Sequence, residues 1–301
     1  SAADLPASAA PSGPETAAAS AVLMEKESGA VLYEKDARQK LEPASVTKIM
    51  TLLLIMEALD SGRIARDDMV TVSAYAAGMG VSQVYRKEGE QMSVSELLKC
   101  ITVVSGNDAA VAMAEYLSGS EAAFVAEMNL RARELGMADT NFVNCTGLPA
   151  QGHLTSAHDI ALMSRELILN HPSIREYTTI WMDSIRDGAF GLTNTNRLVR
   201  FYQGATGLKT GSTDSALYCV SATAERDGME LIAVVMKSPT SAQRFEDAKA
   251  LLDYGFANYT LARVYPDVPL APVEVLLGTT AQVQPQLERE CSLLVRKGEE
   301  G

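Results

Sequence analysis

The stretch ALYCVSATAERDGMELIAVVMK, residues 216–237, sets the fold of the chain. Two runs rich in apolar residues, 216–225 and 229–237, flank the turn at 226–228, whose Asp-Gly pair favours a tight hairpin. Residues 20–38 show a second pair of strand-like runs around Ser28-Gly29. The sequence therefore predicts one β-hairpin near each end of a large domain.

Helical patterns occupy the chain between these hairpins. They cover residues 48–59, 93–117 with a hinge at 105–107, 122–136 and 155–172, and another follows at 241–256. Almost every position in 48–59 is apolar, so this helix is expected to be buried on most of its surface. Strands at both ends with helices between them predict an α+β domain whose terminal strands join in one antiparallel sheet flanked by helices.

The two ends of the chain are set apart from this domain. Residues 1–20 are small and Pro-containing, as in the remnant of a leader or a disordered arm, and are excluded from the predicted fold. Residues 263–301 contain Pro-bounded β-like runs and are too few for a full domain. We expect a domain over 21–262, followed by a linker and the start of a C-terminal β-rich domain.

Composition excludes several classes of function. Lys and Arg total 26 against 38 Asp and Glu, giving a formal charge of -12, and no basic run suggests nucleic acid as a partner. The longest apolar segments fall short of the roughly 18 residues that a membrane-spanning helix needs. The four cysteines are far apart and read as isolated buried thiols, and no Cys/His spacing predicts a metal site or a cofactor.

Ser45 stands three positions before Lys48, where the apolar run begins. If both lie in the first turn of a helix, the lysine projects from the same face, within reach of the serine hydroxyl. A lysine accepts the proton of a serine only if burial or another cation lowers its pKa. A helix cap beside a solvated lysine is the structural alternative for this common pattern.

Two later tripeptides favour catalysis. Ser105-Gly106-Asn107 lies between two predicted helices, and Lys209-Thr210-Gly211 directly precedes the strand at 216–225. Ser-x-x-Lys, Ser-Asp-Asn and Lys-Thr-Gly occur together in β-lactamases and penicillin-binding proteins, and Ser105-Gly106-Asn107 differs from the second of these only at its middle residue. Taken separately, Ser105-Gly106-Asn107 could be a turn between two helices, and Lys209-Thr210-Gly211 could be the start of a strand. Taken together with Ser45 and Lys48, they indicate one active site.

Over about residues 21–262 the sequence resembles the D-alanyl-D-alanine carboxypeptidases, low-molecular-mass penicillin-binding proteins of the serine peptidase S11 type. The segments GLPAQGHLTSAHDIALMSREL (147–167) and TNTNRLVRFYQGATGLKTGSTD (193–214) extend the likeness beyond the motifs. The resemblance implies a β-lactamase/transpeptidase-like fold, followed by a β-rich domain and an amphipathic membrane anchor. Two residues depart from many relatives: Gly106 replaces the Asp of many β-lactamases, and Leu217 stands where many have Gly.

The resemblance also implies the chemistry. Its substrate is the peptidoglycan stem peptide ending in D-Ala-D-Ala, its inhibitors are β-lactam antibiotics that acylate the serine, and its location is the outer face of the cytoplasmic membrane or the cell wall, with membrane contact only through a part beyond Gly301. Ser45 is the nucleophile, Lys48 its base, and Lys209 lowers the pKa of Lys48 by repulsion. The resemblance further implies that the N–H groups of Ser45 and Ser212 are the oxyanion donors, that Ser105 returns the proton and that Asn107 binds the peptide amide. It implies that the substrate carboxylate is bound by Thr210, Gly211 and Arg244. Arg244 could equally be an ordinary surface arginine.

Two other functions share these motifs. A β-lactamase needs a group that activates the deacylating water, and Glu166 to Asn170, ELILN, fits the pattern of one lactamase class. Because it falls inside an amphipathic helical stretch, a helix-surface glutamate is the better interpretation. A sensor would be acylated once without turnover. Release of free D-alanine distinguishes the peptidase from both. His153 and His158 are interpreted as structural.

Overall fold

The computed structural model describes residues 13–80, 82–85, 87–264, 273–274, 282–283 and 291–299 of the 301. The chain divides into two compact units, residues 1–255 and 256–301, which are described separately.

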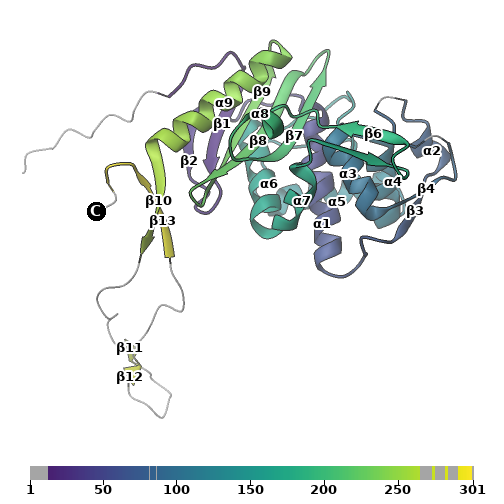
Figure 1. The fold of residues 1–301 in the computed structure, drawn as a ribbon, viewed down its shortest axis with the longest axis horizontal. Coiled ribbons are helices and arrows are strands. Elements are labelled where there is room, and N and C mark those ends of the chain that lie inside the picture. Colours follow the sequence, from purple (N-terminus) through teal and green to yellow (C-terminus); the bar gives the residue numbers. More distant parts are fainter. Residues whose placement is uncertain are drawn as a thin grey trace, which may run out of the picture. The chain divides into compact units, whose positions relative to one another are not determined.

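The first unit is built on a five-stranded antiparallel sheet with the strand order β2-β1-β9-β8-β7. The strands are β1 (Ser20–Glu25), β2 (Val31–Lys35), β7 (Ala205–Thr213), β8 (Leu217–Arg226) and β9 (Met229–Ser238). Because β1 pairs with β9, the first and last strands of the domain meet in one sheet, which confirms the predicted arrangement. The strand β7, which carries Lys209-Thr210-Gly211, lies at one edge (Figure 1).

The predicted helices are confirmed. They are α1 (Lys48–Asp60), α3 (Val94–Val104), α4 (Asn107–Ser118), α5 (Glu121–Glu134), α6 (Ala157–Asn170) and α9 (Ser241–Asn258). The shorter elements have too few residues for a periodic signal: the helical turns η1 (Ala44–Thr47), α2 (Ala74–Ala77), η2 (Pro172–Ile174), α7 (Arg175–Thr178) and α8 (Leu198–Phe201), and the hairpins β3–β4 (Met69–Thr71, Gln91–Ser93) and β5–β6 (Met182–Ile185, Phe190–Thr193).

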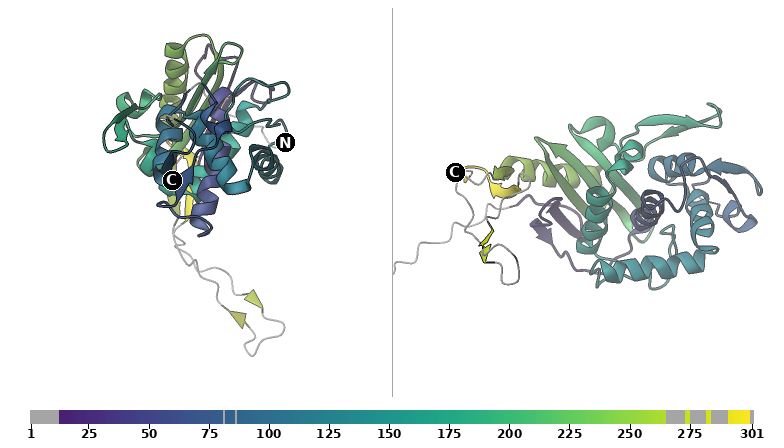
Figure 2. Two further views of the ribbon diagram at one scale, coloured as in Figure 1. Left: turned by 90° about the vertical axis from the view of Figure 1, so that its right-hand side faces the viewer. Right: turned by 90° about the horizontal axis from the view of Figure 1, so that it is seen from below.

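Helices cover both faces of the sheet. Gly255 of α9 packs against Leu231 and Leu23 on one face, whereas Ser164 of α6 hydrogen-bonds Ser221 of β8 on the other, 2.8 Å between the hydroxyls. Beyond the free edge of β7, α1, α3 and α4 form a helical region (Figure 1, Figure 2). The helix α1 is buried on most sides, which explains why its sequence is apolar at nearly every position.

The N-terminal segment joins the domain before the predicted boundary at residue 21. The backbone N–H groups of Ala17 and Ala18 donate to the carboxylate of Asp247 on α9, at 3.2 and 3.0 Å. Lys35 donates to the carbonyl of Thr16. The folded part therefore begins near residue 16, because these hydrogen bonds hold the segment beside α9 and β2. Residues 1–12 lie outside the described residues.

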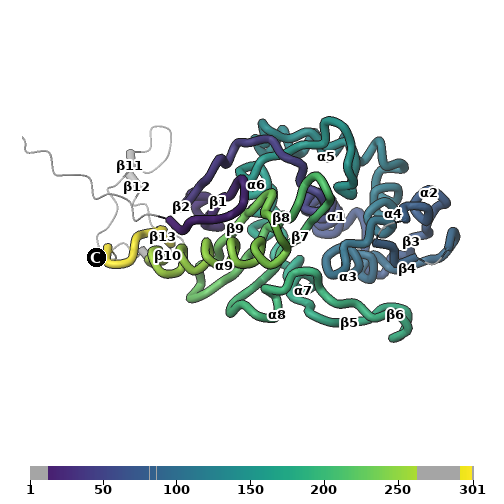
Figure 3. Tube along the Cα trace, turned by 90° about the horizontal axis from the view of Figure 1, so that it is seen from above, coloured from purple at the N-terminus to yellow at the C-terminus, as the bar shows by residue number. Residues whose placement is uncertain are grey.

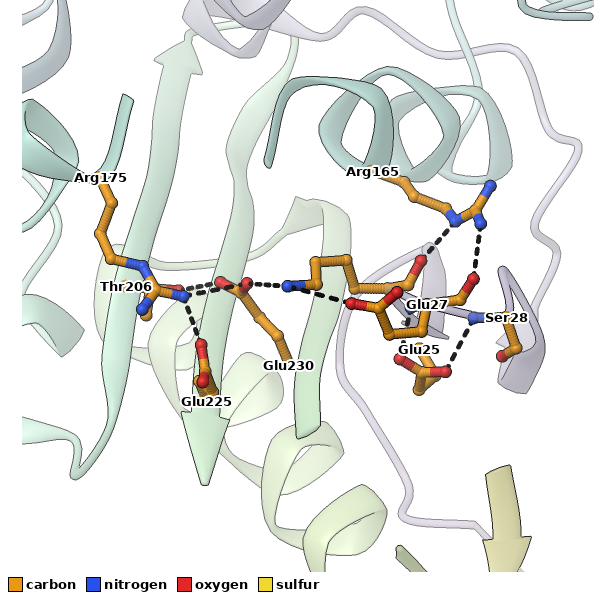
Figure 4. Close-up of polar contacts among 9 residues, drawn as sticks. Glu25, Glu27, Ser28, Arg165, Arg175, Thr206, Glu225 and Glu230 are labelled. Carbon is orange, nitrogen blue, oxygen red and sulfur yellow. Dashed lines mark hydrogen bonds and ion pairs between the residues drawn. The ribbon is translucent and has the colours of Figure 1, made fainter. Parts of the chain in front are cut away.

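A buried carboxylate ties several elements together at the end of the sheet where β9 begins (Figure 4). Glu230 is 2% exposed and lies 3.3 Å from the Nζ of Lys26 and 3.1 Å from the guanidinium of Arg175. The hydroxyl of Thr206 also donates to it, at 2.6 Å. Since two cations and a hydroxyl compensate one buried charge, the cluster holds the first hairpin turn, α7, β7 and β9 in register.

The second unit contains a separate β region. The strand β10 (Tyr259–Val264) pairs antiparallel with β13 (Cys291–Arg296), and β11 (Val273–Glu274) pairs with β12 (Gln282–Val283). The start of a β-rich region after α9 is therefore confirmed. The rest of the predicted module falls outside the described residues, so the boundary at residue 262 stays a prediction. No helix in the described part of the chain is long and apolar enough to cross a membrane.

Candidate active site

Ser45 lies in the short turn η1, and Lys48 is the first residue of α1 directly after it. The Nζ of Lys48 donates to the Oγ of Ser45 at 3.0 Å. No side-chain hydrogen bond caps either η1 or α1, and Lys48 has no exposed surface. The alternative of a helix cap beside a solvated lysine is therefore wrong for this pair.

Lys48 is the centre of the polar contacts in this site. Its Nζ also lies within hydrogen-bond distance of three more acceptors: the Oγ of Ser105 at 2.8 Å, the carbonyl of Ser105 at 3.0 Å and the Oδ1 of Asn107 at 2.6 Å. Burial lowers the pKa of Lys48 from 10.5 to about 7, against smaller opposing effects of Cys145 and Asp108. A sizeable fraction of Lys48 is therefore neutral, and able to accept a proton, near pH 7.

Ser105 has a left-handed backbone, with φ at 59°, at the C-terminal end of α3. A non-glycine residue pays roughly 1 kcal/mol or more for this conformation. The turn it makes lets the chain reverse direction into α4 and brings both oxygens of Ser105 to Lys48. The predicted hinge at 105–107 is thus an element that places a functional group.

Asp108, which no sequence motif singled out, fixes the segment 82–85 beside the site. Its buried carboxylate accepts hydrogen bonds from the backbone N–H groups of Val84 and Tyr85, at 2.8 and 2.6 Å, and burial raises its pKa. The N–H of Asn107 donates to the carbonyl of Ser82 at 2.8 Å. These bonds fix residues 82–85 against the start of α4. The only sequence signal was its position next to Asn107.

The edge strand β7 brings the third motif to the serine. Side chains alternate along a strand, so Lys209 and Gly211 point to the same face. A Cβ atom at Gly211 would lie 2.6 Å from the backbone nitrogen of Ser45 and 2.8 Å from that of Val46. Only glycine lets the strand approach Ser45 this closely. Lys209 and Ser45, 164 residues apart in the sequence, therefore lie on the same side of β7.

Lys209 is buried, and its Nζ donates to the carbonyl of Thr210 at 2.9 Å. Burial, then repulsion from Lys48 and Arg244, places the pKa of Lys209 well below its usual value. The sequence motifs predict that Lys209 lowers the pKa of Lys48. The main cause for Lys48 is instead burial, because this helix start is enclosed on all sides, and the repulsion bears on Lys209.

Two hydroxyls meet on the opposite face of β7. The Oγ1 of Thr210 lies 2.6 Å from the Oγ1 of Thr195, a residue that the sequence analysis did not select. The N–H of Thr195 donates to the carbonyl of Val103, two residues before Ser105. Thr195 therefore connects the third motif to α3. Ser212, two residues after Thr210 on β7, is exposed at the free edge, where a strand presents unpaired N–H groups.

Arg244 is not a surface residue. Only 6% of it is exposed, and its guanidinium donates to the carbonyls of Gly211 and Cys219, each at 3.3 Å. It also lies 4.5 Å from the ring centroid of Phe245. Burial lowers the pKa of Arg244 to about 10, so it is charged at neutral pH. The surface alternative is wrong because α9 turns this arginine back onto β7.

Glu166, His153 and three of the cysteines, which were interpreted from the sequence as structural residues, have structural roles. Glu166 is on α6, and its carboxylate accepts from Arg131 of α5 at 2.9 Å, so it is a helix-surface glutamate. The ring of His153 accepts from the N–H of Val143 and contacts Thr47 at 2.7 Å. Burial lowers the pKa of His153 to about 4, so it is a neutral structural histidine. Cys100, Cys145 and Cys219 are free and buried, as predicted. The described residues contain no cluster of metal-ligand side chains.

The fold and this site define a serine-type acyl-transfer enzyme. Its features are a serine hydroxyl that is hydrogen-bonded to a buried lysine and that lies at the free edge of an antiparallel sheet flanked by helices. A model of the D-alanyl-D-alanine carboxypeptidase family matches residues 7–240. The chain belongs to this family, and it is a serine-type D-Ala-D-Ala carboxypeptidase, a hydrolase.

Curated relatives agree with this assignment. The chain is 46% identical over 287 residues to the D-alanyl-D-alanine carboxypeptidase DacF of Bacillus subtilis, covering 94% of this chain and 74% of DacF. It is 38% identical to DacA of Escherichia coli, covering 96% of this chain and 73% of DacA.

Solved structures show the same fold. Penicillin-binding protein 5 of Haemophilus influenzae superposes with a TM-score of 0.87 at 32% identity, covering 96% of this chain and 85% of that one. Penicillin-binding protein D2 of Listeria monocytogenes, in its ampicillin-bound form, superposes with a TM-score of 0.70 at 36% identity, covering 80% of this chain and 98% of that one. The β-lactamase/transpeptidase-like fold expected from the resemblance is confirmed.

Proposed function

We propose that this protein removes the terminal D-alanine from peptidoglycan stem peptides through an acyl-enzyme on Ser45. The observation that carries the proposal is the contact between the Nζ of buried Lys48 and the Oγ of Ser45 at 3.0 Å. A serine hydroxyl needs a neighbour that takes its proton, and a lysine with a pKa of about 7 provides it without a histidine.

In the first step, neutral Lys48 accepts the proton of Ser45 while the Oγ attacks the carbonyl between the two D-alanines. The tetrahedral oxyanion needs donors that are already in place. The N–H of Ser45 and the N–H of Ser212 at the edge of β7 are the proposed pair. Gly211 supports this geometry because it allows β7 to lie directly against the Ser45 turn.

In the second step, the C–N bond breaks and the leaving D-alanine needs a proton. The Oγ of Ser105 lies 2.8 Å from the Nζ of Lys48, so a proton taken from Ser45 can return through Ser105 to the amine. Asn107, which accepts from the same Nζ, is the proposed contact for the peptide amide. Water then hydrolyses the ester on Ser45, with Lys48 again accepting a proton.

Positive charge selects a free chain end. Arg244, which is charged at neutral pH, lies against β7 in a protein whose net charge is -12. The hydroxyl of Thr210 and the backbone at Gly211 are the proposed contacts for the substrate carboxylate. Arg244 acts from behind the strand, because its guanidinium is bonded to the carbonyls of Gly211 and Cys219.

The same site accounts for the proposed partners. A β-lactam presents a strained amide and a carboxylate in place of the D-alanyl-D-alanine end, so it acylates Ser45. The acyl-enzyme is then hydrolysed slowly, because no small leaving group has departed from the site. Penicillin-binding protein D2 of L. monocytogenes has been solved with ampicillin and with cefotaxime. Since stem peptides lie outside the cytoplasm, we place the enzyme at the outer face of the cytoplasmic membrane or in the cell wall.

Release of free D-alanine from a soluble peptide ending in D-Ala-D-Ala tests the proposal. We expect turnover by the wild type and loss of nearly all activity in Ser45→Ala, together with loss of labelling by a fluorescent penicillin. Glu134→Ala, a change of an exposed residue on α5, is the control and is expected to retain full turnover. D-alanine release by Ser45→Ala at the wild-type rate would overturn the assignment of the nucleophile.

A further inference from the structure

The turn that carries Ser45 is enclosed from two sides. On one side β7 approaches it at Gly211. On the other side lies the segment between α5 and α6, which runs beside the start of α1 (Figure 3). A Cβ atom at Gly147 of this segment would lie 1.8 Å from the carbonyl oxygen of Ala44 and 2.8 Å from the nitrogen of Ser45. The proposed mechanism uses β7 but no residue of the segment between α5 and α6.

The turn needs support from other segments because its backbone is strained. Ala44, directly before Ser45, has a left-handed backbone with φ at 50°. Residues other than glycine avoid this conformation, because their Cβ atom crowds a carbonyl oxygen. They keep it only where the surrounding structure enforces it. No side-chain hydrogen bond caps η1, so the contacts that fix Ser45 come from elsewhere in the chain.

One such contact joins His153 to Thr47. The Nε2 of His153 lies 2.7 Å from the Oγ1 of Thr47, which stands between Ser45 and Lys48 in the sequence. Both partners are buried: His153 is 3% exposed, and Thr47 has no exposed surface. Because water cannot replace a partner at this depth, the loss of either group leaves a buried polar atom unpaired.

The proton of the His153 ring is on Nε2. The backbone N–H of Val143 donates to Nδ1 at 2.9 Å, so Nδ1 carries no proton. Burial lowers the pKa of His153 to about 4, against a smaller opposing effect of Glu42, so the neutral ring has a single proton at pH 7. Nε2–H therefore donates to the hydroxyl of Thr47. The ring connects Val143 to Thr47 without adding a charge beside the turn.

The segment that carries His153 is itself fixed by hydrogen bonds. The N–H of Gly147 donates to the side-chain oxygen of Asn144 at 2.8 Å, which closes the loop on itself. Thr155 pairs with Leu41 through two backbone hydrogen bonds, at 2.8 and 2.9 Å. The segment is therefore attached to the chain just before η1 and gives His153 a stable support.

We propose that His153 is a positioning residue for the acyl transfer: it holds Thr47, and thereby the turn, in the orientation in which the hydroxyl of Ser45 meets the amine of Lys48. The inference rests on the proposed function and deepens it. His153 acts through Thr47 and exchanges no proton with the substrate. Its loss is expected to slow acylation and to leave affinity unchanged, because the proposed contacts for the substrate carboxylate lie on β7.

Two substitutions separate the two hydrogen bonds of His153. His153→Asn keeps an acceptor near the position of Nδ1 for the N–H of Val143, but its amide is too short to reach Thr47. His153→Gln is long enough to place an amide N–H near the position of Nε2.

We expect His153→Asn to lower the limiting rate of acylation by penicillin by about ten- to a hundredfold, with the half-saturating concentration unchanged. His153→Gln is expected to recover to within about threefold of the wild-type rate, because the donor to Thr47 is restored. His158→Asn on α6, where the histidine side chain is 17% exposed, is the matched control and is expected to keep the wild-type rate. A folded His153→Asn with the wild-type rate would overturn the proposal.

The second test approaches the same contact from Thr47. Thr47→Val has a similar volume but no hydroxyl, so it is expected to slow acylation by a similar factor, and Thr47→Ser is expected to recover most of the rate. When His153→Asn and Thr47→Val are combined, the losses are expected not to multiply, because both remove one contact. Losses that multiply would contradict a shared role. If His153→Asn does not fold, a wild-type rate in Thr47→Val overturns the proposal.

Nuclear magnetic resonance of the ¹⁵N-labelled protein tests the contact without turnover. The histidine whose signals disappear in His153→Asn is expected to be neutral and protonated on Nε2 at pH 6. A ring that is charged at this pH, or protonated on Nδ1, would contradict donation to Thr47.

The outcomes separate the two proposals. A wild type that is acylated by penicillin but releases no D-alanine contradicts the proposed function, while the acylation rates of the variants still decide the role of His153. A wild type that releases D-alanine, with a folded His153→Asn equal to it in acylation and release, contradicts the positioning role alone.

Discussion

Replacement of Gly211 by alanine is the sharpest test of how closely β7 packs against Ser45, the proposed nucleophile. A Cβ atom at this position would lie 2.6 Å from the nitrogen of Ser45, 2.8 Å from that of Val46 and 3.0 Å from the carbonyl oxygen of Pro43. All three are backbone atoms, so no side chain can rotate away. Either β7 or the turn η1 must move.

The size of the movement follows from these distances. Ordinary van der Waals contact begins at 3.4 Å, so the nitrogen of Ser45 and the new methyl group must separate by about 0.8 Å. A displacement near 1 Å at reacting groups costs on the order of a hundredfold in rate. Overpacking of this kind costs about 1–3 kcal/mol of stability, a fall in Tm of a few degrees for a domain of this size.

We therefore expect Gly211→Ala to fold and to lose about a hundredfold in kcat/KM for D-alanine release, with a similar loss in the rate of acylation by penicillin. Gly191→Ala on β6 is the matched control, because no atom lies within 4 Å of the added methyl group. This control is expected to keep full activity. Gly211→Ala with unchanged Tm and wild-type kcat/KM would refute the close approach of β7 to Ser45.

Three further predictions concern single groups. Only neutral Lys48 accepts a proton, and its pKa is about 7. The rate of acylation by a β-lactam, measured by stopped flow, is therefore expected to rise with pH through 7 and to be about tenfold lower at pH 6 than at its plateau. A rate that does not change from pH 6 to 8 would exclude Lys48 as the base. Glu230→Ala is expected to lower the free energy of unfolding in urea by about 2–3 kcal/mol, less than for a fully buried pair because Arg175 is partly exposed, and unchanged stability would contradict the role of the cluster. Glu166→Ala is expected to leave the hydrolysis rate of the penicillin acyl-enzyme within about twofold of wild type, since this glutamate forms an ion pair on α6; a large loss would support β-lactamase chemistry.

Much of the domain could be predicted from local patterns. The hairpin at 216–237, the buried helix from Lys48 and the hinge at 105–107 each show a periodicity or a turn pair that is complete within one segment. Elements of three or four residues, such as β5 and α8, gave no such signal. The structure of these short elements depends on the neighbouring helices and strands against which they pack.

The sequence by itself identified the residues that we propose to carry the chemistry, because Ser45, Lys48, Ser105 and Lys209 stand in short motifs whose order is visible in one dimension. Only the tertiary structure decided the state of these groups. The pKa of Lys48 follows from burial, which requires segments far apart in the chain to enclose one ammonium group. The burial of Arg244 behind β7 and the role of Asp108 likewise arise from contacts between distant segments, and no local pattern encodes such contacts.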